Sequence, residues 1–312
     1  MRERRCCPLL SARLPHPYDD AMSKLPFWKM HGAGNDFVVF EPVAGTPGAD
    51  GNWSVLATAI CDRHFGVGAD GLIIVLPSEM ADRRMRIINA DGSEAEMCVN
   101  GIRCFAKYCL DLGLVDVPDG AMTVDTLSGV VPVQATRDAG GAVCTVRLEL
   151  AAPELEPASV GVQMEQAAPV LDLPVTISGA GVDRTMPVAL VSMGNPHAVQ
   201  FIEERPAEYP LELVGPMVEH HSLFANRTNF EVVHVEDRSH IDMRVWERGV
   251  GETQACGSGA CAVVVAAHIR GEVDDRVDVS LPGGTLNIEW TGEGPVTLTG
   301  PVTKVFKAEW KI

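Results

Sequence analysis

The sequence predicts an α+β protein of two pseudo-symmetric domains, each a mainly antiparallel sheet wrapped around a central helix. The first reason is a repeat, since Met85 and Cys98 recur as Met243 and Cys256, 158 positions later. The second is the form of each copy: a β-prone run, a glycine-bearing turn, one cysteine and an apolar helix. The third is that the helix expected after Cys256 is apolar on every side, so strands must surround it. A repeat this long indicates two domains, because solenoid repeats are far shorter.

The repeat extends beyond the cysteines, so chance is a poor explanation. Glu94 recurs as Glu252 and Gly101 as Gly259 at the same separation. Further correspondences join Gly71-Leu-Ile-Ile-Val with Asn229-Phe-Glu-Val-Val, and Gly34-Asn35 with Gly194-Asn195, the last displaced by two more residues. Each half of the chain therefore has one cysteine at the equivalent position of the repeat.

The composition is that of a globular protein that can bury two cores. The chain has 312 residues, 46% hydrophobic and 21% charged, which argues against disorder. The net charge of −17 leaves no broad basic surface for nucleic acid or an anionic membrane. Nine cysteines, an odd number in a chain too long to need disulfides, predict reduced thiols in a cytoplasmic protein. The longest apolar helix candidate, Ala260–Ile269, is about half as long as a bilayer crossing.

Residues 1–24 carry four arginines, three prolines and two aspartates without apolar periodicity. Arginine-rich transit peptides contain little acid, so a transit peptide is the weaker interpretation. We predict a disordered or non-native N-terminal extension, with Met22 as an alternative start, and assign it no function.

In the first domain, residues 27–40 predict two strands joined at His31-Gly-Ala-Gly-Asn35, since paired glycines favour a turn. A short helix is expected at Ser54–His64. The loop Gly66-Val-Gly-Ala-Asp-Gly71 and the apolar strand Leu72–Leu76 follow. A phosphate-binding interpretation of this loop is weak, because the GK[ST] ending is missing and a strand follows.

The central helix of the first domain is expected to begin near Cys98 and to end before Gly113, a natural C′ residue. Its apolar stripe has helical spacing and consists of Ile102, Phe105, Ala106, Cys109 and Leu110. Cys109 lies on this stripe and is interpreted as a core residue.

The proline-rich stretch 151–157 marks the boundary between the domains. We place the first domain at 25–150, with strands in 123–150, and the second at 151–299. The second repeats the scheme, with strands in 188–201 and 230–235 and a helix that opens at Cys256. Closing strands in 297–310 are expected, and residues 300–312 are expected to return to the first domain.

Cys98 and Cys256 are the candidate catalytic residues. A cysteine at a helix N-terminus has its thiolate favoured by unpaired N–H groups and the positive end of the dipole. Two opposed thiols suit inversion at a tetrahedral carbon, because one removes a proton and the other returns a proton to the opposite face. A thiol pKa of about 8.5 needs little adjustment for this work. Main-chain N–H groups of Asn100-Gly101 and Gly257-Ser258-Gly259 would hold a substrate carboxylate, so no metal or pyridoxal cofactor is required.

At these residues the sequence resembles the diaminopimelate epimerases. The motifs are HGAGNDF, NADGSEAEMCVNGIRC, GNPHAV, RTNFEVV, WERGVGETQACGSGACA and KVFKAEW, which together run from Phe27 to the end. The resemblance implies cofactor-independent interconversion of LL- and meso-diaminopimelate, on the way to lysine and peptidoglycan. It also implies a homodimer with a small-molecule substrate.

The resemblance implies a role for each site residue. Cys98 and Cys256 would be the acid–base pair, with His197 and Glu247 tuning their proton affinity. The residues implied to contact substrate are Asn35, Asn89, Val99, Asn100, Asn195, Asn229, Glu247, Arg248, Gly257 and Ser258. The chain departs from the family at Val99, where the pattern has glycine, and at Gly71, where some relatives carry glutamine. A β-branched residue at Val99 would be strained at positive φ and narrows the approach to the carboxylate in any conformation.

Other readings stay open. Asn35 and Asn195 are also typical turn residues, His197 could be a hydrogen-bonded loop histidine, and Glu247 could pair with Arg248. At the level of the whole protein, the alternatives are a two-thiol racemase of another amino acid and a catalytically impaired homologue carrying Val99. A zinc site of Cys98, Cys104, Cys256 and Cys261 is disfavoured, since the spacings lack C-x₂₋₄-C.

Overall fold

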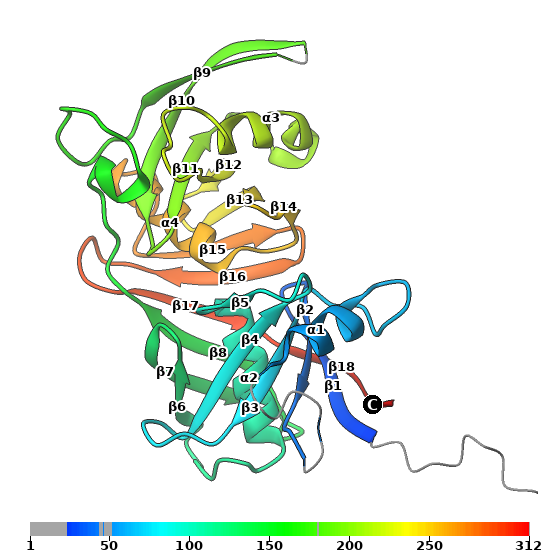
Figure 1. Ribbon diagram of the computed structural model, residues 1–312. Helices are drawn as coiled ribbons and strands as arrows, with labels where there is room; N and C mark the ends of the chain where they lie inside the picture. Colours follow the sequence, from blue (N-terminus) through cyan, green and yellow to red (C-terminus); the bar gives the residue numbers. More distant parts are fainter. Residues whose placement is uncertain (1–23, 44–45, 47–51, 180, 312) are drawn as a thin grey trace, which may run out of the picture.

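The structure is a computed structural model that describes residues 24–43, 46, 52–179 and 181–311. Within these residues it contains four α-helices and eighteen strands, arranged as two sheet-rich halves (Figure 1). The architecture is the predicted α+β fold of two duplicated halves. The prediction of an N-terminal extension falls almost wholly outside the described residues, which begin at Lys24 in the first strand.

The first half contains two helices, α1 (Ser54–Cys61) and α2 (Val99–Asp111). Its strands are β1 (Lys24–Gly32), β2 (Asn35–Phe40), β3 (Gly71–Leu76), β4 (Arg83–Asn89), β5 (Glu94–Ala95), β6 (Ala121–Thr126), β7 (Gly129–Arg137) and β8 (Val143–Leu150). Pairing is mainly antiparallel, with parallel contacts between β2 and β3 and between β4 and β6. The sheet wraps around α2, which is buried along nearly its whole length.

The second half repeats this order with α3 (Leu211–Glu219) and α4 (Gly257–Ile269). Its strands are β9 (Leu173–Gly179), β10 (Val182–Ser192), β11 (Pro196–Phe201), β12 (Asn229–Asp237), β13 (His240–Glu247), β14 (Gly251–Thr253), β15 (Arg276–Leu281), β16 (Gly284–Glu289) and β17 (Val296–Pro301). The parallel pairs β11–β12 and β13–β15 occupy the places of β2–β3 and β4–β6. The helices α2 and α4 keep the 158-residue separation at both ends.

Two strands join the halves. β17 pairs with β16 on one side and with β8 of the first half on the other, so one hydrogen-bonded ladder crosses the boundary (Figure 1). The last strand, β18 (Thr303–Lys311), pairs with β1. The C-terminal strand therefore lies beside the first strand of the first half. The predicted domain division, with boundaries at 150 and 299 and residues 300–312 joining the first domain, remains a proposal.

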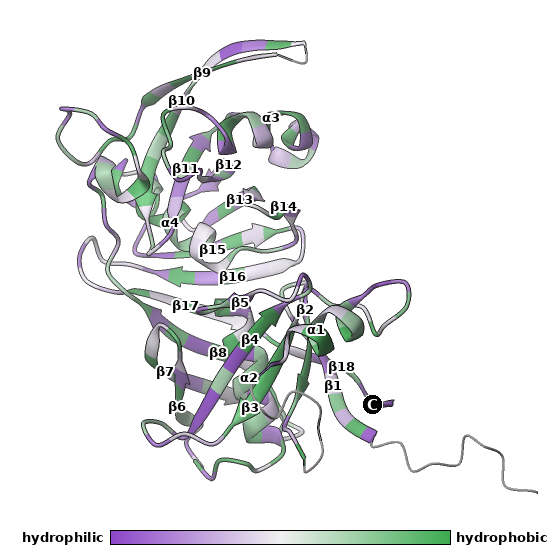
Figure 2. Cartoon of the chain, viewed as in Figure 1, coloured by the Kyte–Doolittle hydropathy of each residue, from purple (hydrophilic) through white to green (hydrophobic). Residues whose placement is uncertain are grey.

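The apolar strand β3 shows how the first half is layered. Its residues alternate between two cores: Ile73 packs in the cluster that contains α2, whereas Leu72 and Ile74 pack in a separate cluster with α1. A strand buried on both faces needs a continuous apolar run. Figure 2 accordingly shows β3 as apolar along nearly its whole length.

The ends of the helices follow local chemistry. Gly113, at φ +66°, follows the C-cap of α2, and its N–H and that of Leu114 donate to carbonyls of the last turn, as predicted. The helix α1 ends at Cys61 instead of at His64. The reason is Asp62, which leaves the helical conformation and accepts hydrogen bonds from the N–H groups of His64 and Phe65.

The helix α3 was not predicted, because Pro216 lies inside it and Pro210 precedes it. Within the described residues, none of the helices is both long enough and apolar enough to cross a membrane.

The buried thiols make stability depend on pH. Burial raises the pKa of both Cys61 and Cys104 to about 12, against about 8.5 for a thiol in the unfolded chain. A folded pKa above the unfolded value gives stability that is present below pH 8.5 or so and is lost as the pH rises toward 12. We expect the free energy of unfolding in urea to fall between pH 8.5 and 10, by about 1.4 kcal/mol per pH unit for each such thiol. A Cys104→Ala variant should show a shallower fall, and an equal slope would contradict this account.

Candidate active site

A cavity of about 760 Å³ lies between the two halves, at the N-terminal ends of α2 and α4. Of the predicted site residues, all but three line it: Asn35, Cys98, Val99, Asn100, Asn195, Glu247, Arg248, Cys256, Gly257 and Ser258. The two repeats therefore contribute equivalent turns and helix ends to one cavity, although these residues are far apart in the sequence.

Cys98 is the N-cap residue of α2 and is half-buried. Its Sγ lies 3.6 Å from the Asn35 side-chain oxygen, an acceptor for the thiol proton. Burial raises the pKa of the Cys98 thiol, and the nearby Glu247 carboxylate adds to the rise, while N–H groups of Gly101 and Asn100 oppose it. Burial thus outweighs the helix terminus, which sequence reasoning expected to favour the thiolate.

Cys256 occupies the same N-cap position on α4. The Gly259 N–H donates to its Sγ at 3.3 Å, and the Ser258 hydroxyl lies 3.5 Å away. Burial raises the pKa of the Cys256 thiol well above its ordinary value, with further rises from the Glu247 and Glu231 carboxylates. Burial therefore favours the protonated form of both thiols.

The two helix ends are in direct contact. A Cβ placed on Gly257 would lie 2.9 Å from the Cβ of Val99, closer than real carbon contacts allow. Asn100 reaches across the same boundary and donates to the Ala255 carbonyl at 2.9 Å. The φ of Val99 is not positive, so its backbone is unstrained. Its side chain fills the space that a glycine at this position would leave beside Gly257.

This contact predicts a coupled pair of substitutions. Gly257→Ala should lower the free energy of unfolding by about 1–3 kcal/mol, because the added methyl overpacks against Val99. In a Val99→Gly background the same change should cost much less, since the clashing side chain is gone. Urea denaturation of the four proteins of this cycle measures the coupling. Additive costs would show that the two helix ends do not touch.

His197 lies behind the cavity wall and is fully buried with Glu231. Its Nδ1 is 2.6 Å from the Glu231 carboxylate, and its Nε2 is 3.0 Å from the Asn195 side-chain oxygen. The Asn195 amide nitrogen in turn donates to the Ser258 hydroxyl at 3.2 Å. Sequence reasoning missed Glu231, although an acidic residue inside the apolar run Asn229-Phe-Glu-Val-Val was the available signal.

Glu247 is the last residue of β13, Arg248 follows it, and both line the cavity. The Glu247 carboxylate accepts a hydrogen bond from Thr253, and burial raises its pKa. Arg248 is exposed, and its backbone N–H donates to the Asn229 side-chain oxygen at 2.8 Å. Within the described residues no ion pair joins Glu247 to Arg248, so the guanidinium is not neutralised by its neighbour.

Three predicted residues do not line the cavity. His197 and Asn229 are buried behind it, where they hold Asn195 and Arg248. Asn89 is exposed at the end of β4, and its amide donates to the Ser93 hydroxyl at 3.0 Å. Asn89 is the counterpart of Glu247 in the repeat, so the two halves present different chemistry at equivalent positions.

Arg103, which sequence reasoning did not single out, is fully buried on α2. Its Nε lies 3.3 Å from the Pro301 carbonyl of β17, and neither terminal nitrogen has a hydrogen-bond partner among the described residues. Burial lowers its pKa, against the influence of the thiols Cys104, Cys98 and Cys261. Arg103 thus ties the helix of the first half to the strand shared by both halves.

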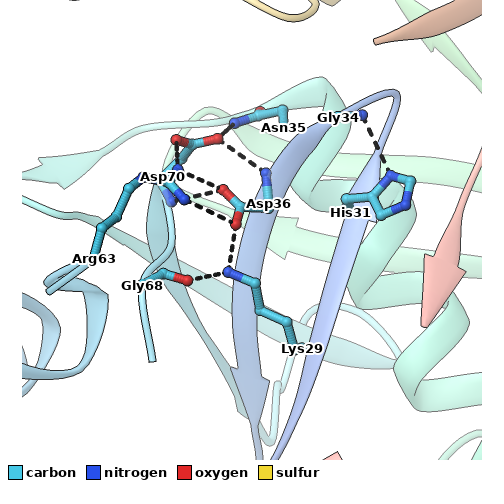
Figure 3. Close-up of polar contacts among 8 residues, drawn as sticks. All are labelled: Lys29, His31, Gly34, Asn35, Asp36, Arg63, Gly68 and Asp70. Atoms are coloured by element: carbon cyan, nitrogen blue, oxygen red, sulfur yellow. Dashed lines mark hydrogen bonds and ion pairs between the residues drawn. The ribbon is translucent and has the colours of Figure 1, made fainter. Parts of the chain in front are cut away.

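Asn35 is held by a cluster of charged side chains (Figure 3). Its amide nitrogen donates to the Asp70 carboxylate at 2.7 Å, and Arg63 bridges Asp70 and Asp36. Lys29, which is buried, pairs with Asp36 from the other side. In the described part of the chain, no group of three or more His, Cys, Asp or Glu side chains is arranged to hold a metal ion.

Comparisons with known proteins show strong similarity over most of the chain. A family model described as diaminopimelate epimerase matches residues 27–149 and again residues 189–305. A relative named diaminopimelate epimerase from Moorella thermoacetica is 46% identical over 287 residues, covering 92% of this chain and 99% of its own. One of the same name from Methanococcus maripaludis is 41% identical over 286 residues, covering 91% and 99%.

Solved structures with the same fold are more distant in sequence. A Bacillus anthracis phenazine biosynthesis protein of the PhzF family aligns with a TM-score of 0.67 at 16% identity, over 93% of this chain and 100% of that one. A hydroxyproline epimerase from Agrobacterium vitis, with trans-4-hydroxy-L-proline bound, aligns with a TM-score of 0.66 at 16% identity, over 92% of both chains. At these identities the likeness shows the fold alone.

Proposed function

Because the chain belongs to the diaminopimelate epimerase family, we propose that it interconverts LL-2,6-diaminopimelate and meso-diaminopimelate by a two-base reaction that needs no cofactor. The family consists of isomerases, so the chain is an enzyme of that class. The observation that carries the mechanism is the placement of Cys98 and Cys256, from equivalent helix ends, on the wall of one cavity.

In the proposed reaction one cysteine, as thiolate, takes the proton from the α-carbon and becomes a thiol. The second cysteine, as thiol, gives its proton to the opposite face of the same carbon and becomes a thiolate. The configuration inverts, and the charge has moved from one sulfur to the other. Because burial raises the pKa of both thiols, we propose that the α-ammonium group of the substrate helps to form the first thiolate.

The negative charge that develops as the proton leaves is stabilised at the helix ends. The α-carboxylate would accept hydrogen bonds from main-chain N–H groups at the starts of α2 and α4, where unpaired donors and the positive dipole ends converge. Arg248 also lines the cavity, and its guanidinium suits the distal carboxylate, since a guanidinium can form two parallel hydrogen bonds to a carboxylate. Glu247 would meet the distal ammonium.

The proposal also covers the protein's setting. We propose a cytoplasmic enzyme that acts in the formation of lysine and peptidoglycan precursors and forms a homodimer. Support for a dimer comes from β18, which pairs only with β1 among the described strands and exposes Val305 and Phe306. An unpaired strand edge with apolar side chains is a site where another chain adds. Light scattering on the purified protein, expected to give twice the mass of one chain, tests this part.

Incubation of the purified protein with LL-diaminopimelate in deuterated water tests the function. We expect meso product with deuterium at the inverted α-carbon, since the proton returned comes from a thiol in exchange with solvent. Other amino acids are incubated in parallel. Exchange in one of those but not in diaminopimelate would identify a racemase with a different substrate.

The effect of Val99 is tested by comparing deuterium exchange in the wild-type protein and in Val99→Gly. If the wild-type protein shows no exchange and Val99→Gly gains it, the natural chain is a catalytically impaired homologue. If both exchange, the valine only tunes the approach of the carboxylate. The contact between Val99 and Gly257 favours a measurable difference in KM between the two proteins.

A further inference from the structure

The glycine loop Gly66–Gly71 is the one sequence motif that the proposed function leaves without a role. The loop folds back on the end of α1, where the Val67 N–H donates to the Ile60 carbonyl and the Ala69 N–H to the Cys61 carbonyl. Gly68 has φ +77°, and a Cβ on Gly66 would lie 2.4 Å from the Ala59 carbonyl oxygen, so larger residues do not fit there. This tight turn places Asp70 beside the β1–β2 turn (Figure 3).

Asp70 fixes the orientation of the Asn35 side chain. One carboxylate oxygen of Asp70 accepts the Asn35 amide N–H at 2.7 Å and the Asp36 backbone N–H at 2.9 Å. A carboxylate can only accept, so the Asn35 amide nitrogen must face Asp70 and its oxygen must face away. That oxygen lies 3.6 Å from the Cys98 sulfur and 3.2 Å from the Asn100 amide nitrogen.

Charged neighbours hold Asp70 itself in place. Arg63 donates to the second Asp70 oxygen at 2.6 Å and to Asp36 at 2.8 Å. Although burial opposes ionisation, hydrogen bonds from Arg63 and Lys29 hold the pKa of Asp36 at about 2. The Lys29 ammonium also donates to the Gly68 carbonyl, so the cluster is tied back to the glycine loop. These contacts therefore hold the Asp70 carboxylate in one position.

The second half holds its equivalent amide the other way round. Asn195, the counterpart of Asn35, turns its oxygen toward His197 Nε2 and its nitrogen toward the Ser258 hydroxyl. His197 Nδ1 lies 2.6 Å from the Glu231 carboxylate, and this contact fixes the ring with its Nε2 toward the Asn195 oxygen. The amide oxygen of Asn35 therefore faces Cys98, whereas the amide nitrogen of Asn195 faces Ser258, near Cys256. Asp70 in one half and the His197–Glu231 pair in the other create this difference.

We propose that Asp70 is a positioning residue of the active site, which holds the Asn35 oxygen toward Cys98 so that this thiol keeps a fixed hydrogen-bond acceptor. The inference rests on the proposed function only for its effect on turnover. Its effect on the Cys98 thiol follows from the contacts alone. Without Asp70 only the Asn100 amide, 3.2 Å from the Asn35 oxygen, still favours this orientation, so the acceptor of the Cys98 proton is held less firmly.

The exposure of Asp70 and Arg63 distinguishes a positioning role of Asp70 from a role in folding alone. The Arg63 and Asp70 side chains are 56% and 42% exposed, and exposed ion pairs contribute little to stability. A role in folding alone therefore predicts almost no effect of an Asp70 substitution. A positioning role predicts a change confined to the first half of the site.

The test uses Asp70→Asn, which offers both a donor and an acceptor and so no longer enforces the Asn35 orientation. We expect kcat for diaminopimelate to fall about tenfold with a smaller change in KM, as for other losses of orientation. Alkylation by iodoacetamide, followed peptide by peptide across pH, should show Cys98 reacting several-fold faster at a given pH. Cys256 should react as in the wild-type protein, and Tm should not change.

Arg63→Gln is the second variant, and we expect it to raise the alkylation rate of Cys98 by a smaller factor. Asp125→Asn is the matched control, because Asp125 is a carboxylate of the same half that accepts from Ser78 at 2.9 Å and does not line the cavity. An unchanged Cys98 alkylation profile in both Asp70→Asn and Arg63→Gln would overturn the proposal, as would equal shifts at both cysteines. If the Cys98 shift appears while the wild-type protein leaves diaminopimelate untouched, the positioning role stands and the proposed substrate falls.

Discussion

Replacing Cys98 or Cys256 with serine is expected to lower the rate of epimerisation by between about 10² and 10⁴-fold, the usual contribution of a positioned acid or base. A serine hydroxyl is far less acidic than a thiol, so it cannot form the anion that takes the α-proton. Inversion slows in each variant, because the proposed reaction needs a proton acceptor on one face and a donor on the other. Elimination from a halogenated diaminopimelate analogue needs only one of them, so a slow residual reaction is expected there.

Cys144→Ser provides the matched control for both variants. Cys144 is a half-buried free thiol on β8, outside the cavity lining, so its replacement should leave turnover unchanged. Deuterium exchange in diaminopimelate and product stereochemistry are measured for all three proteins. If either active-site variant inverted diaminopimelate at the wild-type rate, the two-thiol mechanism would be wrong.

The second large effect is expected at Glu231. Its carboxylate and the His197 ring are both fully buried and lie 2.6 Å apart. Removing one partner of a buried pair leaves the other without compensation, so Glu231→Ala should lower the free energy of unfolding by about 3–5 kcal/mol. Turnover should fall as well, because His197 then loses the partner of its Nδ1 and, with it, the ring position that holds Asn195 beside Ser258.

Glu231→Gln separates the two consequences. It keeps the volume of the side chain, so we expect a smaller loss of stability than in Glu231→Ala together with a comparable loss of turnover. Glu289→Ala is the control, because Glu289 pairs with the exposed Arg276 and should contribute no more than about 1 kcal/mol. Urea denaturation and steady-state kinetics are the measurements. Equal stability losses in Glu231→Ala and Glu289→Ala would show that the buried pair has no special weight.

Features with a local signal were predictable from the sequence. The apolar stripe on α2, its end at Gly113 and the start of α4 after Cys256 all follow from short-range spacing. The repeat then placed the two cysteines at equivalent helix ends. The family match over both repeats agrees with that assignment of the fold.

What depends on distant contacts could not be predicted in the same way. The Asn35–Asp70 hydrogen bond joins residues from β2 and from the loop before β3, and no spacing rule links them. Arg103 lies on α2, whose apolar stripe predicts one buried face, whereas nearly every residue of this helix is buried in the structure. The thiol pKa values were expected to follow the helix dipole, but burial has the larger effect, and the depth of burial is set by the whole fold.

The strand β17 limits how the cavity can open. Its hydrogen bonds to β8 on one edge and to β16 on the other cannot lengthen without breaking the ladder. The halves therefore cannot separate by translation at this seam. Opening must be a rotation with β17 near its axis, so the cysteines, which lie off the axis, travel farther than the strand. Amide hydrogens of β17 should then exchange slowly even in a protein whose active site opens freely to solvent.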